Sequence, residues 1–260
     1  MDGYGGDQIR AAERGHLEAG EPLMQRAADG LARIVGDLLD DPAVRPGDGP
    51  GAVLVLAGSG DNGGDALFAG ARLASAGRLV TVLRVGSRVH EAGLAAASAA
   101  GARLLGEDGP EAAAGPTGAS GSDAGAADVL HAATTSPAER LARLAREASL
   151  DADLVLDGVL GIGGGGPLRS PAREVVAALR ELARDQRAPF VVAVDVPSGI
   201  DVDTGGIADD HVLHADVTVT FGGVKAGLLR GPGATLAGRI ELVDVGIGAD
   251  LATTEPLVRT

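Results

Sequence analysis

The residues that indicate the fold are Ala52-Val-Leu-Val-Leu-Ala-Gly-Ser-Gly-Asp-Asn-Gly-Gly-Asp65. The first six are apolar, and a short uninterrupted apolar run is typical of a strand buried in a parallel sheet. Helical spacing of apolar residues starts at Asp65 and continues to Gly77. Between strand and helix, glycines let the backbone turn tightly and approach a ligand closely; they are Gly58, Gly60, Gly63 and Gly64. A strand, a glycine turn and a helix N-terminus together predict an anion-binding site.

The segment Gly58-Ser-Gly-Asp-Asn-Gly63 has the G-x-G-x-x-G spacing of dinucleotide-binding proteins. However, the next expected strand ends near Arg84, where such proteins carry an acidic residue for the ribose. Asp65 would also place negative charge where a pyrophosphate binds. Two other interpretations therefore stay open. The segment is either an ordinary tight turn capped by Asp65, or a polar cradle in which Asn62 and Asp65 frame two glycines and supply oxygen ligands.

Strands alternate with helices along the rest of the chain, which predicts a three-layer α/β/α, Rossmann-like sandwich with a mainly parallel sheet. We expect a single domain over residues 1–260, with N-terminal helices within residues 7–39 and a flexible insertion at about 106–127. Residues 1–6 look frayed. The expected strands are 52–57, 79–85, 102–105, 128–132, 152–157, 190–195, 216–221 and 239–245.

Composition excludes several functional classes. The net charge of −14 argues against nucleic acid or an anionic membrane as the main partner, although a small anionic ligand needs only local donors. Cysteine is absent, so there is no disulfide or thiolate chemistry. No apolar run approaches the ~20 residues of a membrane span, and residues 1–20 are too polar for a signal peptide. These features predict a cytoplasmic protein that binds no membrane.

The polar motifs follow predicted strands, and in parallel sheets ligands bind at the carboxyl ends of strands. Asp157 and Asp195 each end an apolar run, so each either points into a shared site or caps the following turn. Asn62, Asp157 and Ser198 together offer an amide oxygen, a carboxylate and a hydroxyl, a set suited to an alkali or alkaline-earth cation. Zinc is disfavoured because cysteine is absent and histidine is scarce near these loops.

Three further features carry less weight. Lys225 is the only lysine in the chain, which has 21 arginines. Either the compact ammonium group of a lysine is needed at this position, or Lys225 is a surface lysine that was kept by chance. Asp209-Asp-His-Val-Leu-His214 resembles a metal cluster but lacks a third ligand at fixed spacing. Ser198 lacks the G-x-S-x-G elbow of a nucleophilic serine.

Four ordered motifs resemble the NAD(P)H-hydrate epimerase family, the YjeF N-terminal domain. They are Gly58-Ser-Gly-Asp-Asn-Gly-Gly-Asp65, Asp157-Gly-Val-Leu-Gly-Ile-Gly163, Val194-Asp-Val-Pro-Ser-Gly-Ile-Asp-Val-Asp-Thr-Gly205 and Thr218-Val-Thr-Phe-Gly-Gly-Val-Lys225. The resemblance covers nearly the whole chain. It implies an isomerase that interconverts the R and S forms of hydrated NADH and NADPH (NADHX and NADPHX). It also implies functional coupling to an ADP- or ATP-dependent dehydratase and, often, a homodimer.

Carried over to this chain, the resemblance implies a potassium ion held by Asn62, Asp157 and Ser198. The substrate would contact Asp61, Asn62, Gly63, Gly64, Asp65, Gly161, Ile162, Gly163, Gly164, Gly165, Gly166, Pro167 and Asp195. Two departures stand out. Asp61 replaces an asparagine common in the family, and the loop Gly163–Gly166 lacks the polar or basic residue that many relatives have before the proline.

A mechanism follows as a hypothesis. The ring nitrogen expels the neighbouring hydroxyl as water, and water then attacks the resulting iminium from either face. Such a reaction needs a proton donor and nearby negative charge. We expect Asp195 to be the catalytic acid/base, with Lys225 orienting a phosphate or tuning Asp195. The alternatives are a non-catalytic nucleotide- or partner-binding module of the same fold and a conventional NAD(P)-dependent oxidoreductase.

Overall fold

The computed structural model describes residues 1–106, 136–163, 166–184 and 189–260. Most of the expected insertion at about 106–127, the expected strand at 128–132, and Gly164 and Gly165 lie outside these residues. The single domain over residues 1–260 therefore stays a prediction. No helix in the described ranges is both long enough and apolar enough to cross a membrane.

A seven-stranded sheet forms the centre of the fold, in the order β4-β3-β2-β5-β6-β7-β8. All its pairings are parallel. Its strands are β2 (Ala52–Ala57), β3 (Leu79–Arg84), β4 (Arg103–Leu105), β5 (Leu154–Gly158), β6 (Phe190–Val194), β7 (Val217–Phe221) and β8 (Arg239–Val243). This arrangement confirms the predicted Rossmann-like class.

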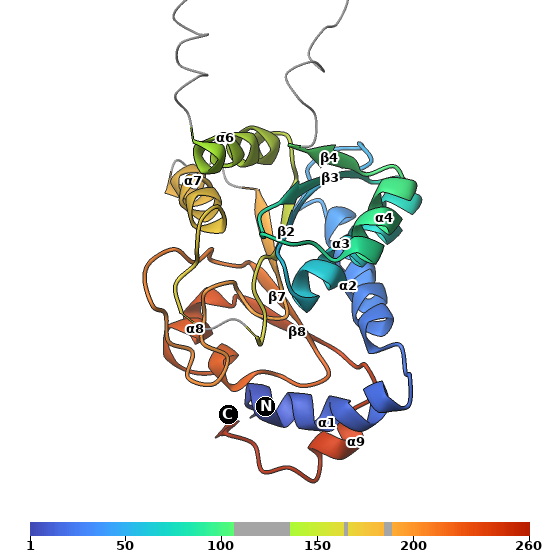
Figure 1. Cartoon of the computed structure of the whole chain (residues 1–260), viewed down its shortest axis with the longest axis vertical. Coiled ribbons are helices and arrows are strands. Elements are labelled where there is room, and N and C mark those ends of the chain that lie inside the picture. Colours follow the sequence, from blue (N-terminus) through green and yellow to red (C-terminus); the bar gives the residue numbers. More distant parts are fainter. Residues whose placement is uncertain (107–135, 164–165, 185–188) are drawn as a thin grey trace, which may run out of the picture.

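Helices cover both faces of the sheet, because alternate residues of each buried strand point to opposite sides. Val53 and Val55 pack in one apolar core with α2 (Leu23–Leu39), α3 (Asp61–Ser75) and α4 (Glu91–Ala99). Leu54 and Leu56 pack in a second core with α6 (Pro137–Leu150) and α7 (Ala172–Arg184). Figure 1 shows these two groups of helices on opposite sides of the sheet.

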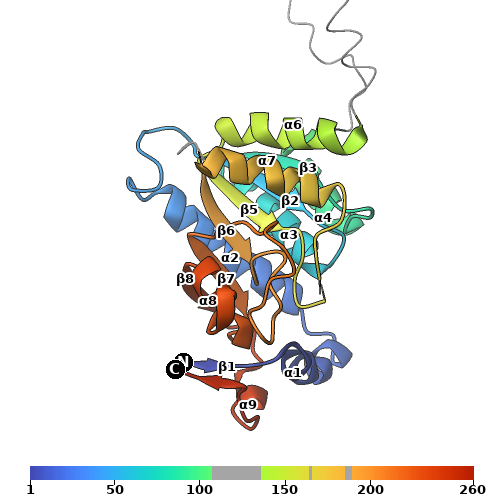
Figure 2. The same ribbon diagram turned by 90° about the vertical axis from the view of Figure 1, so that its left-hand side faces the viewer.

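The two ends of the chain form a separate structure beyond one end of the sheet. Strand β1 (Asp2–Gly3) pairs antiparallel with β9 (Val258–Arg259), and the helices α1 (Gly6–Glu18) and α9 (Gly248–Leu251) lie beside this pair (Figure 2). The expectation that residues 1–6 are frayed is therefore wrong. Their backbone is ordered by distant partners, since the N–H of Tyr4 donates to the carbonyl of Val224 at 2.8 Å. The remaining short helices are η1 (Ala226–Leu228) and α8 (Gly231–Leu236).

The strand order reverses between β2 and β5, where the chain continues in opposite directions across the sheet. At such a switch point the loops that follow the two strands separate and leave a crevice at their carboxyl ends. The glycine turn after β2 and the loop that begins at Asp157 at the end of β5 both lie at this edge. The topology therefore places two of the sequence motifs at the position where α/β folds bind ligands.

Candidate active site

The motifs after β2, β5 and β6 meet because these strands are neighbours in the sheet. Gly58 shows how closely the first two loops approach. A Cβ atom at this position would lie 1.9 Å from the carbonyl oxygen of Val159, so no side chain fits between them. The helix α3 starts at Asp61 rather than at Asp65. Asp65 is therefore a residue of the second helical turn, and the interpretation of Asp65 as the cap of an ordinary turn is wrong.

Asp157 and Ser198 form a buried pair that joins the loops after β5 and β6. The backbone N–H of Ser198 donates to Oδ2 of Asp157 at 2.9 Å, and the Ser198 hydroxyl donates to Oδ1 at 2.6 Å. The N–H of Leu160 in turn donates to Oγ of Ser198 at 2.8 Å. Burial raises the pKa of Asp157, while the hydrogen bonds from Ser198 oppose this rise. Asp157 thus supports both loops and contributes an oxygen-rich face.

Asn62 completes this group from the first turn of α3. Its Nδ2 donates to the carbonyl oxygens of Leu160, at 3.1 Å, and of Val194. The position requires a glycine opposite, because a Cβ atom on Gly161 would lie 1.9 Å from Oδ1 of Asn62. The predicted ligands Asn62, Asp157 and Ser198 are therefore brought together, although their role as ligands stays a prediction.

The atoms around Asn62 match the preferences of a hard cation. The donors nearby are amide, carboxylate, hydroxyl and main-chain carbonyl oxygens, with no sulfur or imidazole among the contacts described above. Rotating the Asn62 amide by half a turn would exchange Nδ2 for Oδ1 and leave three oxygens facing one another, an arrangement that a cation would stabilise. The residues thus fit a metal ion.

Asp195 and Lys225 form a second buried pair, at the end of β6 and after β7. Oδ1 of Asp195 accepts hydrogen bonds from Nζ of Lys225, Oγ1 of Thr220 at 3.1 Å and the N–H of Phe221 at 3.2 Å. Nζ of Lys225 also donates to the carbonyl of Phe221 at 2.8 Å. Lys225 is only 1% exposed. This lysine is therefore held inside the protein by Asp195, and the geometry favours tuning of Asp195 over contact with a phosphate.

The backbone at Asp195 supports a functional role. It is a non-glycine residue with positive φ, at 68°. Aspartate tolerates this left-handed region better than most residues, but the conformation is still uncommon and is found often at functional sites. The three donors reach the same oxygen, Oδ1, so Oδ2 takes part in none of these three hydrogen bonds.

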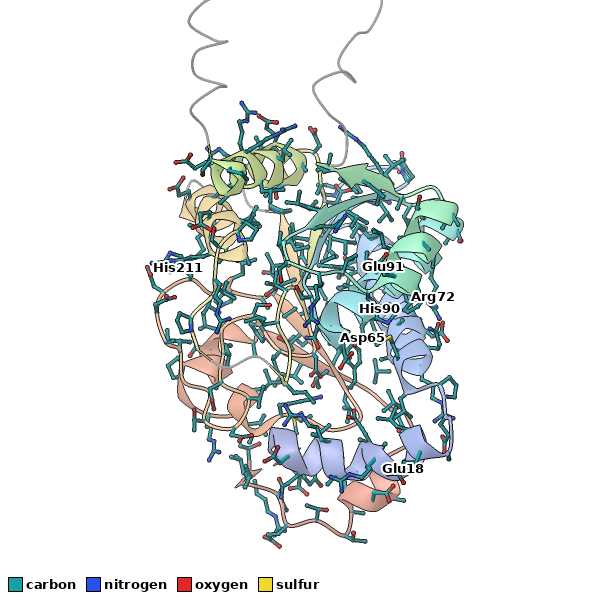
Figure 3. All side chains as sticks on the ribbon, viewed as in Figure 1. Glu18, Asp65, Arg72, His90, Glu91 and His211 are labelled. Carbon is teal, nitrogen blue, oxygen red and sulfur yellow. The ribbon has the colours of Figure 1, made fainter. Side chains whose placement is uncertain are left out.

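Two cavities lie on either side of the start of α3. The acidic cavity, about 240 Å³, is lined by Glu13, Asp61 and Asp65 together with apolar residues that include Met24 and Phe221. The glycine cavity, about 470 Å³, is lined by glycines, by polar residues and by apolar side chains: Gly58, Ser59, Gly60, Val85, Gly86, Ser87, Val159, Leu160, Gly163, Pro167, Leu168, Arg169, Ser170 and Ala172. Of the predicted substrate residues, Asp61 and Asp65 line the acidic cavity and Gly163 and Pro167 line the glycine cavity. The others that the structure describes line neither of these two: Asn62, Gly63, Gly64, Gly161, Ile162, Gly166 and Asp195. Figure 3 shows Asp65 near the start of α3.

Two residues that line these cavities, and one that contacts the predicted substrate loop, were missed in the sequence. Arg169 borders the glycine cavity two positions after Pro167, so a basic residue reaches this cavity from the far side of the proline, although none precedes it in the loop. Glu13 and Arg10 come from α1, and Nη2 of Arg10 donates to the carbonyl of Ile162 in the predicted substrate loop. Residues three positions apart share one face of a helix, so α1 turns this face toward the site. No local motif marks either residue.

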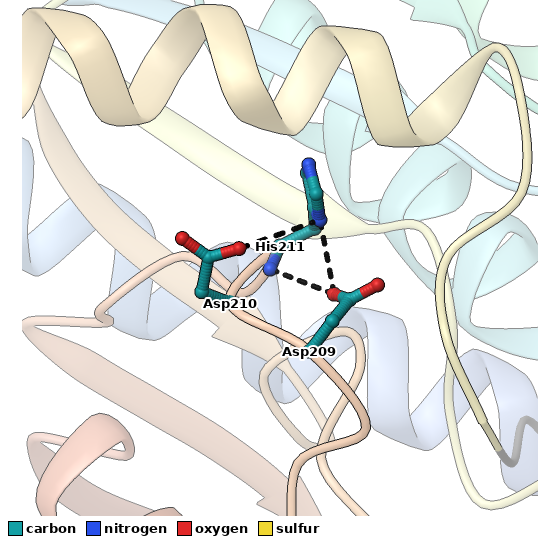
Figure 4. A group of neighbouring side chains, drawn as sticks. All are labelled: Asp209, Asp210 and His211. Carbon is teal, nitrogen blue, oxygen red and sulfur yellow. Dashed lines mark hydrogen bonds and ion pairs between the residues drawn. The ribbon is translucent and has the colours of Figure 1, made fainter.

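The cluster of Asp209, Asp210 and His211 brings three possible ligand atoms within 4.8 Å of one another (Figure 4). Nδ1 of His211 contacts Oδ1 of Asp209 at 3.0 Å, while its Nε2 lies 3.4 Å from Nε of Arg173, which donates to it. A ring that accepts at Nε2 carries its proton on Nδ1. The cluster is held by internal hydrogen bonds and ion pairs, and its three possible ligands are Asp209, Asp210 and His211 rather than the two histidines of the motif.

Comparison with known proteins identifies the family. The sequence model of the family described as YjeF-related protein N-terminus matches residues 20–227. The chain belongs to this YjeF-related family. It is 46% identical to an NAD(P)H-hydrate epimerase of Clavibacter michiganensis subsp. michiganensis, over 99% of this chain and 95% of that protein. It is also 41% identical to the bifunctional NAD(P)H-hydrate repair enzyme Nnr of Mycobacterium tuberculosis, over 98% of this chain and 43% of that enzyme.

A solved structure shares the fold of this YjeF-related chain. The yeast protein YNL200c superimposes with a TM-score of 0.62 at 19% identity, covering 87% of this chain and 83% of the yeast chain. The helix α1, which carries Glu13 and Arg10, precedes the matched range 20–227 of the family. The similarity to the Clavibacter epimerase extends over 99% of this chain and therefore includes this helix.

Proposed function

We propose that this chain is an NAD(P)H-hydrate epimerase that interconverts the R and S forms of NADHX and NADPHX. The observation that carries the proposal is the similarity to the Clavibacter epimerase, which extends over 95% of that protein at 46% identity. The geometry supports it, since polar groups from three neighbouring loops converge at the switch point of the sheet. An isomerase of this type needs no redox partner, and the site offers carboxyl groups for proton transfer.

The two cavities suggest how the substrate lies in the site. The acidic cavity would repel phosphates but would stabilise a ring that becomes a cation, so we place the hydrated nicotinamide there. The glycine cavity offers main-chain groups, Ser59, Ser87 and Arg169, which suit a pyrophosphate. The substrate would pass over the first turn of α3, in contact with Asp61 to Asp65. Asp195 would present Oδ2 to the ring, as its acid/base or as fixed negative charge.

Potassium is the proposed metal ion, held by oxygen atoms of Asn62, Asp157 and Ser198. These residues belong to α3, to the end of β5 and to the loop after β6. The bound ion would supply positive charge that holds the three segments together, close to the substrate. The buried Asp157 carboxylate would gain a partner for its charge.

Exchange of potassium for tetramethylammonium, at constant ionic strength, is expected to lower the melting temperature by several degrees and to slow epimerisation. Tetramethylammonium is larger than potassium and its methyl groups keep its charge away from ligand oxygens, so it cannot replace the ion held by Asn62, Asp157 and Ser198. Differential scanning fluorimetry of the substrate-free protein measures the first effect. The variant Asn62→Ala should lose the response to potassium, and an equal response in this variant would refute the site.

A coupled assay tests the function. NADHX epimers are incubated with excess S-specific dehydratase and its nucleotide, and the absorbance of NADH is followed. The S form is consumed rapidly, and the R form drains slowly by spontaneous epimerisation. An epimerase makes the slow phase fast in proportion to its concentration. If a folded protein with potassium leaves the slow phase unchanged while it still binds the substrate, the alternative of a non-catalytic binding module is favoured.

We further propose that a dehydratase consumes the S form in the cell, because a relative of this chain is a bifunctional repair enzyme. The homodimer and the cytoplasmic location predicted from the sequence stay predictions. Sedimentation of the purified protein tests the first of these directly.

A further inference from the structure

The acidic cavity contains more carboxyl groups than the sequence motifs account for. Asp61 and Asp65 belong to the glycine-turn motif, whereas Glu13 comes from α1. The helices α1 and α3 are separate segments of the fold (Figures 1 and 2). Two carboxyl groups, Glu13 and Asp65, therefore line one cavity from different helices.

Asp65 places at this cavity a buried polar atom without a hydrogen-bond partner in the described part of the chain. Its side chain is 6% exposed and lines the cavity. Its Oδ1 is buried and has no hydrogen-bond partner among the residues that the structure describes. A buried acceptor without a partner is costly and is rarely retained unless a ligand or a proton satisfies it. Burial raises the pKa of Asp65 well above its ordinary value, and the charges of Asp195 and Asp61 add to this rise.

Glu13 is partly buried in the same environment. Burial raises its pKa, and the charges that act on it come from Lys225, Asp195, Asp61 and Arg10. Of these, Lys225 and Arg10 lower the pKa, whereas Asp195 and Asp61 raise it. Glu13 and Asp65 also repel one another. Carboxyl groups that repel one another in such a space favour a state in which not all of them are ionised.

We propose, resting on the epimerase function above, that Glu13 is a second proton-transferring carboxyl of this enzyme and works with Asp65 from a different helix that lines the acidic cavity. The pair would act on the two faces of the nicotinamide ring. Asp195, fixed by Lys225, Thr220 and Phe221, would supply constant negative charge for the cationic ring.

The steps balance. Protonated Asp65 donates its proton to the ring hydroxyl, the carbon–oxygen bond breaks, and the hydroxyl leaves as water. The lone pair of the ring nitrogen forms the carbon–nitrogen double bond of the iminium. A water molecule on the other face then attacks the same carbon, the double-bond electrons return to nitrogen, and ionised Glu13 accepts the proton that the water loses. The enzyme ends with its proton on Glu13, ready for the reverse direction.

The test compares Glu13→Gln with Glu18→Gln, an exposed glutamate on the same helix (Figure 3). We expect Glu13→Gln to lower kcat about 100-fold or more, as for loss of a general acid or base, with little change in KM. Uptake of ¹⁸O from labelled water into NADHX should fall in parallel. Glu18→Gln should match the wild type. Because glutamine is nearly isosteric with glutamate, circular dichroism and melting temperature should show both variants folded.

The wild-type assay separates two failures. If wild-type protein does not accelerate epimerisation, the proposed function fails. If the wild type is active and Glu13→Gln keeps its kcat and its pH–rate profile, the role of Glu13 is refuted. A rise in KM alone would also refute it, since that pattern indicates binding without proton transfer. Recovery of part of kcat in Glu13→Asp, with a shifted pH–rate profile, would support it.

Discussion

Replacement of Lys225 by methionine is expected to lower the free energy of unfolding by about 3–5 kcal/mol, because it leaves the Asp195 carboxylate buried without its cation. Lys225 is 1% and Asp195 4% exposed, so water cannot take the place of the ammonium. Methionine keeps much of the apolar stem but donates no hydrogen bond to Asp195 or to the carbonyl of Phe221. Urea unfolding followed by circular dichroism measures the loss.

The double variant Asp195→Asn/Lys225→Met is the control. It removes both charges, so most of the lost stability should return, and asparagine tolerates the positive φ of residue 195. Epimerase activity should not return, because the negative charge near the ring is gone. A double variant as unstable as Lys225→Met would show that packing of the lysine stem, rather than the ion pair, stabilises this region.

Replacement of Asp65 by asparagine is expected to have opposite effects on activity and stability. Activity should fall about 100-fold or more, because asparagine cannot donate a proton to the leaving hydroxyl. Stability should rise by about 1 kcal/mol, or roughly 2–4 °C in melting temperature for a chain of this size. The gain arises because the variant no longer buries a carboxyl group that burial and the charges of Asp195 and Asp61 disfavour as an anion.

The stability difference between Asp65→Asn and the wild type should depend on pH. In the folded protein the pKa of Asp65 is raised, so the folded state binds this proton more tightly than the unfolded state does. The wild type therefore loses stability as the pH rises from the ordinary aspartate value of 3.8 through the raised value. The difference between Asp65→Asn and wild type should be largest at neutral pH and shrink in acid. A constant difference would contradict the assignment to ionisation of Asp65.

Sequence patterns predicted the sheet well because strands are marked by local signals. The run from Ala52 to Ala57 is apolar throughout, and the observed strand β2 has the same bounds. Other strand ends differ by one or two residues, as for β5, expected at 152–157 and observed at Leu154–Gly158. The start of α3 was placed four residues too late, at Asp65, because glycines at positions 63 and 64 concealed the first helical turn.

The candidate site was predicted only where its residues belong to strand ends. Asn62, Asp157 and Ser198 follow neighbouring parallel strands, so topology alone brings them together. The contacts between side chains within the site were not predictable. Several roles were compatible with Asp195 and Lys225 in the sequence. The buried ion pair between these residues, which are 30 positions apart, became evident only in three dimensions.

What the sequence determined by itself is the parallel sheet, the edge at which ligands bind and the oxygen-rich chemistry of that edge, because apolar runs and glycine turns are local and parallel strands end at a common edge. Only the tertiary structure decided that α1 forms a wall of the acidic cavity. Distant contacts fix that helix: the N–H of Gly6 donates to Oδ1 of Asp203 at 2.8 Å, and Arg10 donates to Ile162. Contacts between residues so far apart arise from packing of the whole chain, which no short pattern records.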